Sequence, residues 1–466
     1  MISPLKAATV VIRGNSPDYA GLTLAFSLYE NQISEKERPI ANVKVQPNGD
    51  FEAKFEVSRT EYIFCRTGIF FLYFFAEPGK EYTLKLPPRT EKNPADKLNP
   101  YFEEIRLHLV VNSSQTQGQS AVDDPKTEIN YLIRTFDDVY DPLYSKVAVK
   151  VIARFSPKNI DSTLLSLENK FSGIAHPYFK DYYTYRMGLI KMMATKFKSR
   201  HVSDNYFLNK PVLYANPAYM ELFNQVYDKY FSYFGRTDEG KVIYDDINVA
   251  KSFSRLKATL SHDKVLNNDT LKEMVILKNL HDGFYEMEFS RSAMLRILDS
   301  LALSTNVPTH RAIAADIREK VTRLLPGYAP PAFSLFNQDS VLVSLNNFKG
   351  KFVYLVFCTT QSYASMKDFE MLKTLQKKHS KLLKIVAISV DDNLSVMRNY
   401  AKKSGYDFAF LHYSNQPSIL KDYDVRTFPT YYLIDREGRL IMSPAPTPGE
   451  DFETKFYEYL KGMHIL

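Results

Sequence analysis

Residues 351–365 have the sequence KFVYLVFCTTQSYAS, in which a continuous apolar run passes directly into a polar turn. An apolar run of this length between polar residues is typical of a strand that is buried on both faces of a sheet. Ser362 and Ser365 stand three residues apart at the beginning of the helical pattern that follows. The sequence therefore predicts a strand at 352–357, a polar turn, and a helix at 362–378 that begins with two serines.

The residues on either side of this stretch continue the alternation of strands and helices. Further strands are predicted at 384–390, 430–434 and 439–442, and further helices at 394–403 and 450–461. Apolar strands that alternate with helices indicate an α/β sheet covered on both faces. The proline-rich segment at 325–332 marks a domain boundary, so this α/β domain is predicted to span residues 327–466.

The first part of the chain has the pattern of β-structure. Short strands are predicted at 9–13, 22–29, 68–76 and 81–86. The dipeptide at 48–49 is Asn-Gly, a strong signal for a hairpin turn between two strands. The side chains that alternate onto one face after this turn are Phe51, Ala53, Phe55 and Val57. Residues 1–97 are therefore predicted to form a small antiparallel β-sandwich.

Between residues 101 and 325 the apolar period becomes helical. The apolar residues that recur at three- and four-residue steps after Asn216 are Met220, Leu222, Phe223, Val226, Tyr227, Tyr230 and Phe231. Residues 101–325 are predicted to form an α-helical domain, and its aromatic stripes are interpreted as packing rather than as a ligand site. A proline-rich, charged segment between Pro87 and Pro100 is the predicted linker to the β-sandwich.

Composition excludes several function classes. The net charge of +7 comes from 60 basic and 53 acidic residues that are well interleaved, which does not favour nucleic-acid binding. No apolar run approaches the ~20 residues that cross a bilayer. Cys65 and Cys358 are too few for a disulfide framework or a zinc site, and no metal or cofactor is predicted. Residues 1–8 lack the apolar region of a signal peptide, so we expect a cytoplasmic chain or one whose leader has been removed.

Residues 327–466 resemble the thioredoxin-like envelope proteins of the TlpA/ResA type, which are related to the alkyl-hydroperoxide-reductase/thiol-specific-antioxidant (AhpC/TSA) group. The segments that carry the resemblance are GYAP at 327–330, VSLNNFKGK at 343–351, YDVRTFPT at 423–430 and IDREG at 434–438. They occur in order over nearly the whole domain. The resemblance implies a thioredoxin-like fold. Residues 1–325 look like the β-then-helical region that often precedes this module in Gram-negative cell-envelope proteins.

In this family the first buried strand leads into the pattern Phe-Trp-Ala-x-Trp-Cys-x-x-Cys. Aligned from residue 357, the pattern has Ser362 and Ser365 at both cysteine positions, so the CxxC is degenerate. Cys358 occupies the position of the first tryptophan and is expected to face the interior. Ser362 is expected to cap the helix, a contribution of roughly 1 kcal/mol relative to alanine. The resemblance also implies that Pro429 is the cis-proline of the family.

The resemblance and the serine pair together favour a thioredoxin-fold protein that binds or scaffolds partners over an enzyme. The residues expected to line a groove for a peptide or protein partner are Tyr363, Ala364, Thr427, Phe428 and Pro429. The alternative is a thiol-disulfide oxidoreductase or antioxidant-type enzyme that uses Cys358 as a lone thiol, or that receives electrons from a partner at Cys65; a peroxidase relative is less favoured. The implied location is the cell envelope or periplasm of a Gram-negative bacterium, with the cytoplasm as the alternative. The sequence assigns neither a ligand nor an oligomeric state.

Three other patterns have simpler interpretations. Residues 235–241 have the spacing of a phosphate loop, but Val242 stands where Ser or Thr would bind magnesium, so a turn between helices is favoured. The histidines of the dipeptides His262-Asp263 and His281-Asp282 are interpreted as surface histidines rather than metal ligands. Asp391 and Asp392 are interpreted as acids that cap the start of the next helix.

Overall fold

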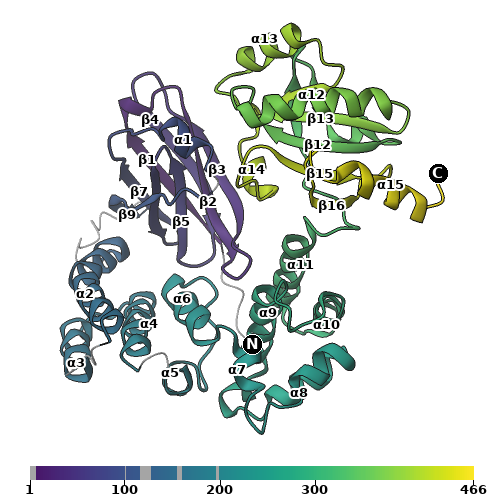
Figure 1. Ribbon diagram of the computed structural model, residues 1–466. Helices are drawn as coiled ribbons and strands as arrows, with labels where there is room; N and C mark the ends of the chain where they lie inside the picture. The colour runs from purple at the N-terminus through teal and green to yellow at the C-terminus, as the bar shows by residue number, and fades with distance from the viewer. Residues whose placement is uncertain (1–6, 100, 116–126, 155–159, 196–198, 466) are drawn as a thin grey trace. The chain divides into compact units, whose positions relative to one another are not determined.

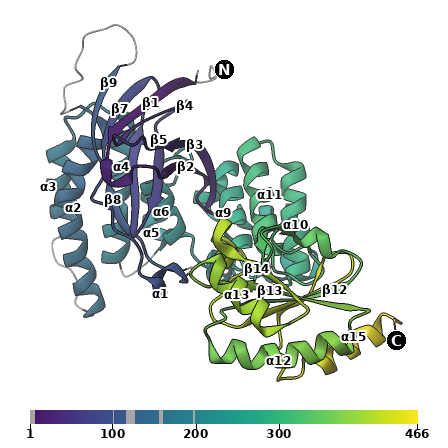
Figure 2. The same ribbon diagram turned by 90° about the horizontal axis from the view of Figure 1, so that it is seen from above.

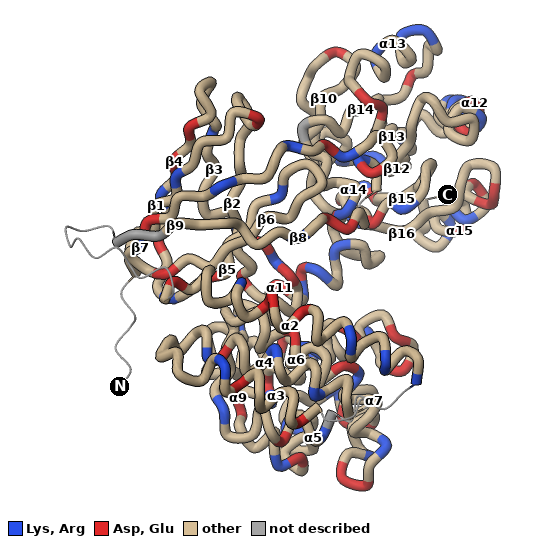
Figure 3. Tube along the Cα trace, turned by 90° about the vertical axis from the view of Figure 1, so that its left-hand side faces the viewer, with Lys and Arg blue, Asp and Glu red and all other residues tan. Residues whose placement is uncertain are grey.

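The computed structural model describes residues 7–99, 101–115, 127–154, 160–195 and 199–465. Most of residues 1–8, on which the signal-peptide prediction rests, and Pro100 of the predicted linker lie outside this set. The described chain forms two compact units, which are treated separately below. The amino-terminal unit comprises the residues up to Glu91 together with Glu104–Arg318, and the carboxy-terminal unit comprises Lys92–Glu103 and the residues from Glu319 onward. Basic and acidic residues are interleaved along both units (Figure 3).

The amino-terminal unit contains two packed sheets. One has the order β4-β1-β7-β9 and the other β3-β2-β5-β6-β8. Pairing is mostly antiparallel, but β1–β7 and β6–β8 are parallel pairs. The strands are β1 (Ala8–Asn15), β2 (Thr23–Asn31), β3 (Lys36–Lys44), β4 (Asp50–Val57), β5 (Glu61–Thr67), β6 (Phe70–Ala76), β7 (Lys80–Lys85), β8 (Ile105–His108) and β9 (Val110–Gln115). The predicted β-sandwich is confirmed, with two parallel pairs that were not expected.

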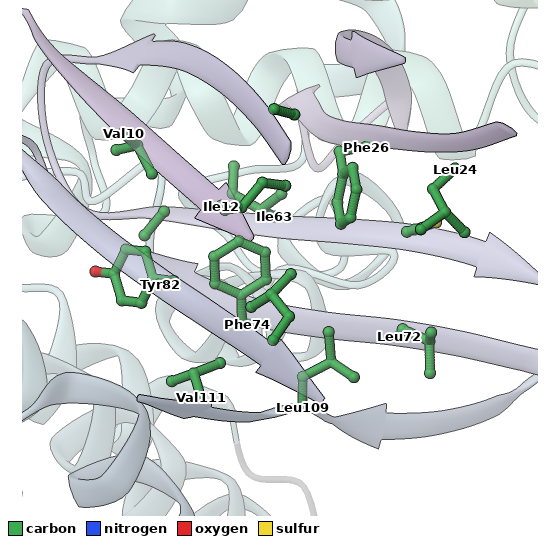
Figure 4. Packing of buried hydrophobic residues seen from close by; sticks show 14 of the residues in the cluster. Val10, Ile12, Leu24, Phe26, Ile63, Leu72, Phe74, Tyr82, Leu109 and Val111 are labelled. Carbon is green, nitrogen blue, oxygen red and sulfur yellow. The ribbon is translucent and has the colours of Figure 1, made fainter. Parts of the chain in front are cut away.

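The core of this sandwich forms because inward and outward side chains alternate along the strands. In β4 the four predicted residues are buried and the charged residues between them are exposed. Figure 4 shows how side chains from both sheets meet; those labelled are Val10, Ile12, Leu24, Phe26, Ile63, Leu72, Phe74, Tyr82, Leu109 and Val111. Burial of such side chains contributes about 1.5–3 kcal/mol each, so this core is the main source of stability of the sandwich.

Two predictions about the strands are wrong. The Asn-Gly turn exists, and Gly49 has φ +90° with the position of a Cβ only 2.6 Å from the nitrogen of Pro17, so glycine is required there. However, β3 and β4 on its two sides lie in different sheets and do not form a hairpin. In addition, the range predicted to be helical begins with β8 and β9, which pair with β6 and β7. Such pairing between strands distant in sequence is invisible to a local periodicity.

The rest of the amino-terminal unit is helical. Its α-helices are α2 (Ile129–Ile152), α3 (Ile160–Phe171), α4 (Pro177–Ala194), α5 (Ser199–Tyr206), α6 (Pro217–Val226), α7 (Tyr230–Phe234), α8 (Phe253–Leu260), α9 (Asp269–Asp282) and α10 (Arg291–Ser304). The helix α11 (Pro308–Thr322) belongs to this unit up to Arg318 and to the carboxy-terminal unit from Glu319. Asn216 caps α6 by accepting a hydrogen bond from the amide of Tyr219, and Pro217 supplies the first helical residue. The aromatic stripe between residues 220 and 231 is buried, which confirms its interpretation as core. Among the described residues, no helix is both long and apolar enough to span a membrane.

The carboxy-terminal unit is built on a seven-stranded sheet of order β11-β10-β14-β13-β12-β15-β16. Its strands are β10 (Ser334–Asn337), β11 (Leu342–Ser344), β12 (Phe352–Cys358), β13 (Leu383–Ser389), β14 (Ala409–His412), β15 (Thr430–Ile434) and β16 (Leu440–Ala445). Its α-helices are α1 (Pro94–Lys97), α12 (Tyr363–Lys378), α13 (Leu394–Ser404), α14 (Ile419–Asp422) and α15 (Phe452–Gly462). β12, β13 and β14 are parallel, and β15 runs antiparallel to β12.

Side chains cover this sheet on both faces, as predicted. One hydrophobic cluster joins alternate residues of β12 and β13 to α12, α13 and α15, and Figure 2 shows α12 and α15 along one side of the sheet. The other cluster joins the intervening residues to α14 and to the segment before β10. Every residue of β12 is buried, which explains its continuous apolar sequence. β14 was not predicted, because its four residues are too few to show a period.

Candidate functional site

The end of the central strand β12 brings together the segments that the sequence singled out. β12 ends at Cys358, and α12 begins at Tyr363 after a four-residue connection. β15 is antiparallel to β12, with Thr430 opposite Phe357. Thr427–Pro429 therefore arrive at the same end of the sheet as the connection that leads into α12. That these two segments form one binding groove remains a prediction.

Several side chains at this end of the sheet are accessible. Tyr363 is 79% exposed and Met366, one turn later on α12, is 38% exposed. Ala364 and Thr427 are exposed as well, whereas Phe428 is half-buried and packs against the second hydrophobic cluster. The Phe428–Pro429 peptide bond is cis. This end of the sheet thus exposes apolar side chains of α12 to solvent. The segment 427–429, which precedes β15, lies at the same end.

Ser362 occupies the N-cap position of α12 with extended backbone angles, φ −91° and ψ 129°. Its side chain nevertheless forms no hydrogen bond with the amides of the first turn. The expected capping contribution of Ser362 is therefore absent, and that prediction is wrong. The amides at the start of α12 consequently have no side-chain acceptor from this residue.

Ser365, three residues after Ser362, is fully buried (0% exposed). Its hydroxyl oxygen has no hydrogen-bond partner among the described residues. A buried hydroxyl without a partner costs about 1–3 kcal/mol, whereas a thiol is only a weak donor and loses much less. The surroundings of residue 365 therefore suit a cysteine side chain better than the serine that is present.

Asp391 organises the connection between β12 and α12, a role that no sequence pattern indicated. The carboxylate is buried, and its Oδ1 accepts hydrogen bonds from the Thr359 hydroxyl (2.7 Å) and the Thr360 amide (2.9 Å). Its Oδ2 accepts from the hydroxyls of Thr360 (2.7 Å) and Ser389 (2.6 Å). The interpretation of Asp391 as a helix cap is wrong, because Asn393 caps α13 by accepting from the amide of Val396 at 3.1 Å.

His412, the last residue of β14, extends this buried network. Its Nδ1 accepts a hydrogen bond from the amide of Ser414, so Nε2 carries the proton and donates to the carbonyl oxygen of Asp391 at 2.9 Å. Burial lowers the pKa of His412, although its hydrogen bond to Asp391 opposes the shift. The imidazole is thus neutral near pH 7. No sequence pattern indicated this residue, because the strand that carries it was not recognised.

Cys358 lies beneath the site but is inaccessible. The residue is 0% exposed, as expected, and its Sγ lies 3.6 Å from the carbonyl oxygen of Ile388. Burial raises the pKa of this thiol well above its usual value, and the charge of Asp391 raises it further. Cys65 in the amino-terminal unit is also buried, and burial raises its pKa to about 12. Since the thiolate is the reactive species, both thiols are poor nucleophiles in the folded protein.

We predict that neither thiol reacts with a disulfide reagent such as dithionitrobenzoate in the native state. For Cys65, the pKa shift from 9.0 to about 12 lowers the thiolate fraction at pH ~8 about a thousandfold. Because both pKa values are raised, reactivity should increase as the pH rises and should be negligible at neutral pH. Both cysteines should react once guanidinium chloride unfolds the chain. Rapid native reaction at Cys358, identified by mass spectrometry, would contradict the prediction.

The remaining motifs have structural roles. Residues 236–242 form turns that follow α7, as interpreted from the sequence. The two histidines in question have protein partners, since His262 lies 3.3 Å from the carbonyl oxygen of Glu239 and His281 lies 2.6 Å from Asp282. Within the described ranges, no group of three His, Cys, Asp or Glu side chains is placed to hold a metal ion.

Comparisons with known proteins concern mainly the carboxy-terminal unit. The sequence model of the Redoxin family matches residues 326–456. Thiol-disulfide oxidoreductase ResA of Bacillus thuringiensis subsp. konkukian is 30% identical over 137 residues, which are 29% of this chain and 76% of that protein. The chloroplastic peroxiredoxin Q of Populus jackii is 29% identical over 179 residues, 35% of this chain and 74% of that protein.

One solved structure likewise matches only a minor part of this chain. The thioredoxin domain of a thiol-disulfide oxidoreductase from Bacteroides vulgatus is 23% identical and covers 29% of this chain and 96% of its own, with a TM-score of 0.26. The match with ResA spans three quarters of that relative. The Redoxin match lies within the domain whose strand order is described above. Through this carboxy-terminal, thioredoxin-like domain, the chain belongs to the Redoxin family and is a relative of the ResA thiol-disulfide oxidoreductases.

Proposed function

We propose that this chain is a thioredoxin-fold protein that binds a partner polypeptide at the start of α12 and has lost disulfide exchange. The observation that carries the proposal is the pair of serines at the two motif positions, Ser362 at the helix start and Ser365 buried behind it. Disulfide exchange requires a thiolate that attacks a sulfur atom. A serine hydroxyl is not ionised near neutral pH and forms no disulfide, so this site has no redox chemistry of its own.

The proposed binding surface consists of Tyr363, Ala364, Thr427, Phe428 and Pro429. Its support is the exposure of Tyr363 together with Met366 on the next turn, since exposed aromatic and methionine side chains are enriched at protein interfaces. The segment that precedes β15 lies at the same end of the sheet and offers backbone groups to an extended peptide. A partner would bury apolar side chains against α12 and pair its backbone with residues 427–429.

The alternative function is a thiol-disulfide oxidoreductase that uses Cys358 or a thiol supplied by a partner. The relatives named ResA and peroxiredoxin Q favour this class of chemistry in general. However, the mechanism needs an accessible thiol of low pKa, whereas Cys358 is fully buried and its pKa is raised. The proposed location is the cell envelope, which follows from the resemblance to envelope proteins.

The proposal is tested by comparing binding of a partner that co-purifies with the native chain. We expect the double variant Tyr363→Ala/Phe428→Ala to bind that purified partner at least about tenfold more weakly, because aromatic anchors dominate interface energies. The matched control is Tyr285→Ala, which removes a tyrosine that is 53% exposed in the amino-terminal unit. Equal binding by the double variant and the control would place the interface elsewhere. Insulin reduction at the rate of an active thioredoxin would overturn the loss of redox function.

A further inference from the structure

The amino-terminal unit contains a cavity of about 420 Å³ that shares no residue with the site described above. It lies between the five-stranded sheet and the helices α2, α4 and α6, which both views place beside that sheet (Figures 1 and 2). The volume is in the range of small-molecule sites, which are typically ~300–1,000 Å³. The residues that line the cavity come from several elements that are far apart in sequence, so only the folded unit forms it.

Aromatic rings form one wall of this cavity. Tyr62, Tyr73 and Phe75 come from β5 and β6, and they point to the face opposite the sandwich core because side chains alternate along a strand. Tyr29 on β2 and Tyr182 on α4 complete a set of five rings. The rings of Tyr62 and Tyr73 lie 5.1 Å apart between centroids, and those of Phe75 and Tyr182 lie 5.8 Å apart. The wall therefore offers several aromatic faces within a small volume.

The charged lining of the cavity is predominantly acidic. Its carboxyl groups belong to Glu35, Asp137, Asp141 and Glu221, and its guanidinium groups belong to Arg106 and Arg186. With all of these groups ionised, the lining carries two more negative than positive charges. A cavity lined with this balance of charge repels anions and attracts cations.

One cation of the protein itself, the guanidinium of Arg186, already pairs with carboxylates in this cavity. The guanidinium of Arg186 lies 2.7 Å from Asp141 and 3.4 Å from Glu221, and it stacks 4.3 Å from the ring centroid of Tyr140. Asp137 is left with a longer contact to Arg186 (3.8 Å) and a hydrogen bond from the Tyr182 hydroxyl at 2.9 Å. Asp137 is thus a half-buried carboxyl group whose ion pair with Arg186 is longer than the contact that Arg186 makes with Asp141.

We infer that this cavity is a binding site for an organic cation, an ammonium or guanidinium group carried on a small apolar body. The positive charge lies beside Asp137, and the apolar body rests against the tyrosine rings. Aromatic faces and carboxylates are the two groups that stabilise a desolvated organic cation, and here both line the same cavity. This function goes beyond partner binding at α12 and does not depend on it.

Because the pKa of Asp137 lies near neutral pH, binding of a cation beside it should depend on pH. Burial raises the pKa of Asp137 to about 7, opposed by Arg186 and reinforced by the neighbouring charges of Asp141 and Asp138. The other groups that face it are the hydroxyl of Tyr182 on α4 and Tyr73 on β6. A cation binds the ionised carboxylate, so affinity should fall about tenfold between pH ~8 and pH ~6 as this carboxyl becomes protonated.

The test uses three probes that share one aromatic body and differ in charge: phenethylammonium, 2-phenylethanol and phenylacetate. Titration calorimetry with the full chain at pH ~8 should show phenethylammonium binding at least about tenfold more tightly than the other two. Asp137→Asn should lower the affinity for phenethylammonium about tenfold and remove its pH dependence. The side chain of asparagine still accepts a hydrogen bond from Tyr182, so we expect this variant to fold.

Two further variants test whether the effect on binding is specific to carboxylates that line the cavity. Glu221→Gln changes an exposed lining residue and should weaken binding of phenethylammonium by a smaller factor, about threefold. Glu168→Gln removes an exposed carboxylate on α3 that does not line the cavity, and it should leave binding unchanged. Equal or tighter binding of 2-phenylethanol or phenylacetate, an unchanged affinity in Asp137→Asn, or no binding of any probe would each overturn the inference.

Discussion

Replacement of both Ser362 and Ser365 by cysteine is expected to produce a chain that forms an internal disulfide and reduces insulin. Residues three apart at a helix start have Cα atoms about 5–6 Å apart, within the ~4.4–6.8 Å that a disulfide spans. The first cysteine would lie at the start of the 16-residue helix α12, where Ser362 leaves the amides without a side-chain acceptor. Those amides stabilise a thiolate and lower its pKa below ~8.5. We expect insulin reduction at least about a hundredfold faster than that of the native chain.

The second position contributes as well, because residue 365 is buried and its hydroxyl has no hydrogen-bond partner. A thiol there removes an unsatisfied hydroxyl, so Ser365→Cys alone should leave stability unchanged or raise it by about 1 kcal/mol. The single variants Ser362→Cys and Ser365→Cys serve as controls and should show no internal disulfide. Alkylation followed by mass spectrometry measures the disulfide directly. A double variant that stays reduced under oxidised glutathione would show that α12 does not have the geometry assigned to it.

Asp391→Ala is expected to destabilise the carboxy-terminal unit by roughly 3–5 kcal/mol, since each buried donor left without an acceptor costs ~1–3 kcal/mol. The carboxylate accepts four hydrogen bonds, from the hydroxyls of Thr359, Thr360 and Ser389 and from the Thr360 amide. These donors stand at the ends of β12 and β13, so their loss should release the connection that leads into α12. Partner binding should weaken together with stability.

Two substitutions distinguish the loss of these hydrogen bonds from the loss of a negative charge. Asp391→Asn keeps one acceptor oxygen and should cost about half as much. Asp392→Ala removes the adjacent, exposed carboxylate and should change stability by no more than about 0.5 kcal/mol. Urea unfolding followed by circular dichroism gives the free energies, and hydrogen exchange at residues 359–362 locates the change. Equal effects at 391 and 392 would contradict the assigned role of Asp391.

The carboxy-terminal unit was predictable from sequence to an unusual extent. Continuous apolar runs mark β12 and β13, which are buried on both faces, and helical periods mark α12 and α13. These signals are local, since burial on both faces or on one face imposes a pattern on consecutive residues. Ser362 and Ser365 were equally visible, because residue identities need no coordinates.

In contrast, the hydrogen-bond and strand-pairing partners of individual residues could not be predicted from the sequence. β14 is too short to show a period, and with it His412 was missed. Asp391 and Asp392 look alike in sequence, yet one is buried with four donors and the other is exposed. Whether an acid caps a helix or satisfies a distant loop depends on which strand ends beside it. That information lies in the pairing of β12 with β13 and not in the residues around position 391.

Local patterns of apolar and polar residues established most strands and helices of the carboxy-terminal unit, and the resemblance of residues 327–466 to a known family established its thioredoxin-like fold. The fold in three dimensions added the separation of β3 and β4 into two sheets, the burial of Ser365 without a partner, and the cavity around Asp137. The physical reason is that the period of apolar residues along a segment depends on which of its faces is buried against the core. Strand pairing, hydrogen-bond satisfaction and cavities depend instead on contacts between residues that are distant along the chain.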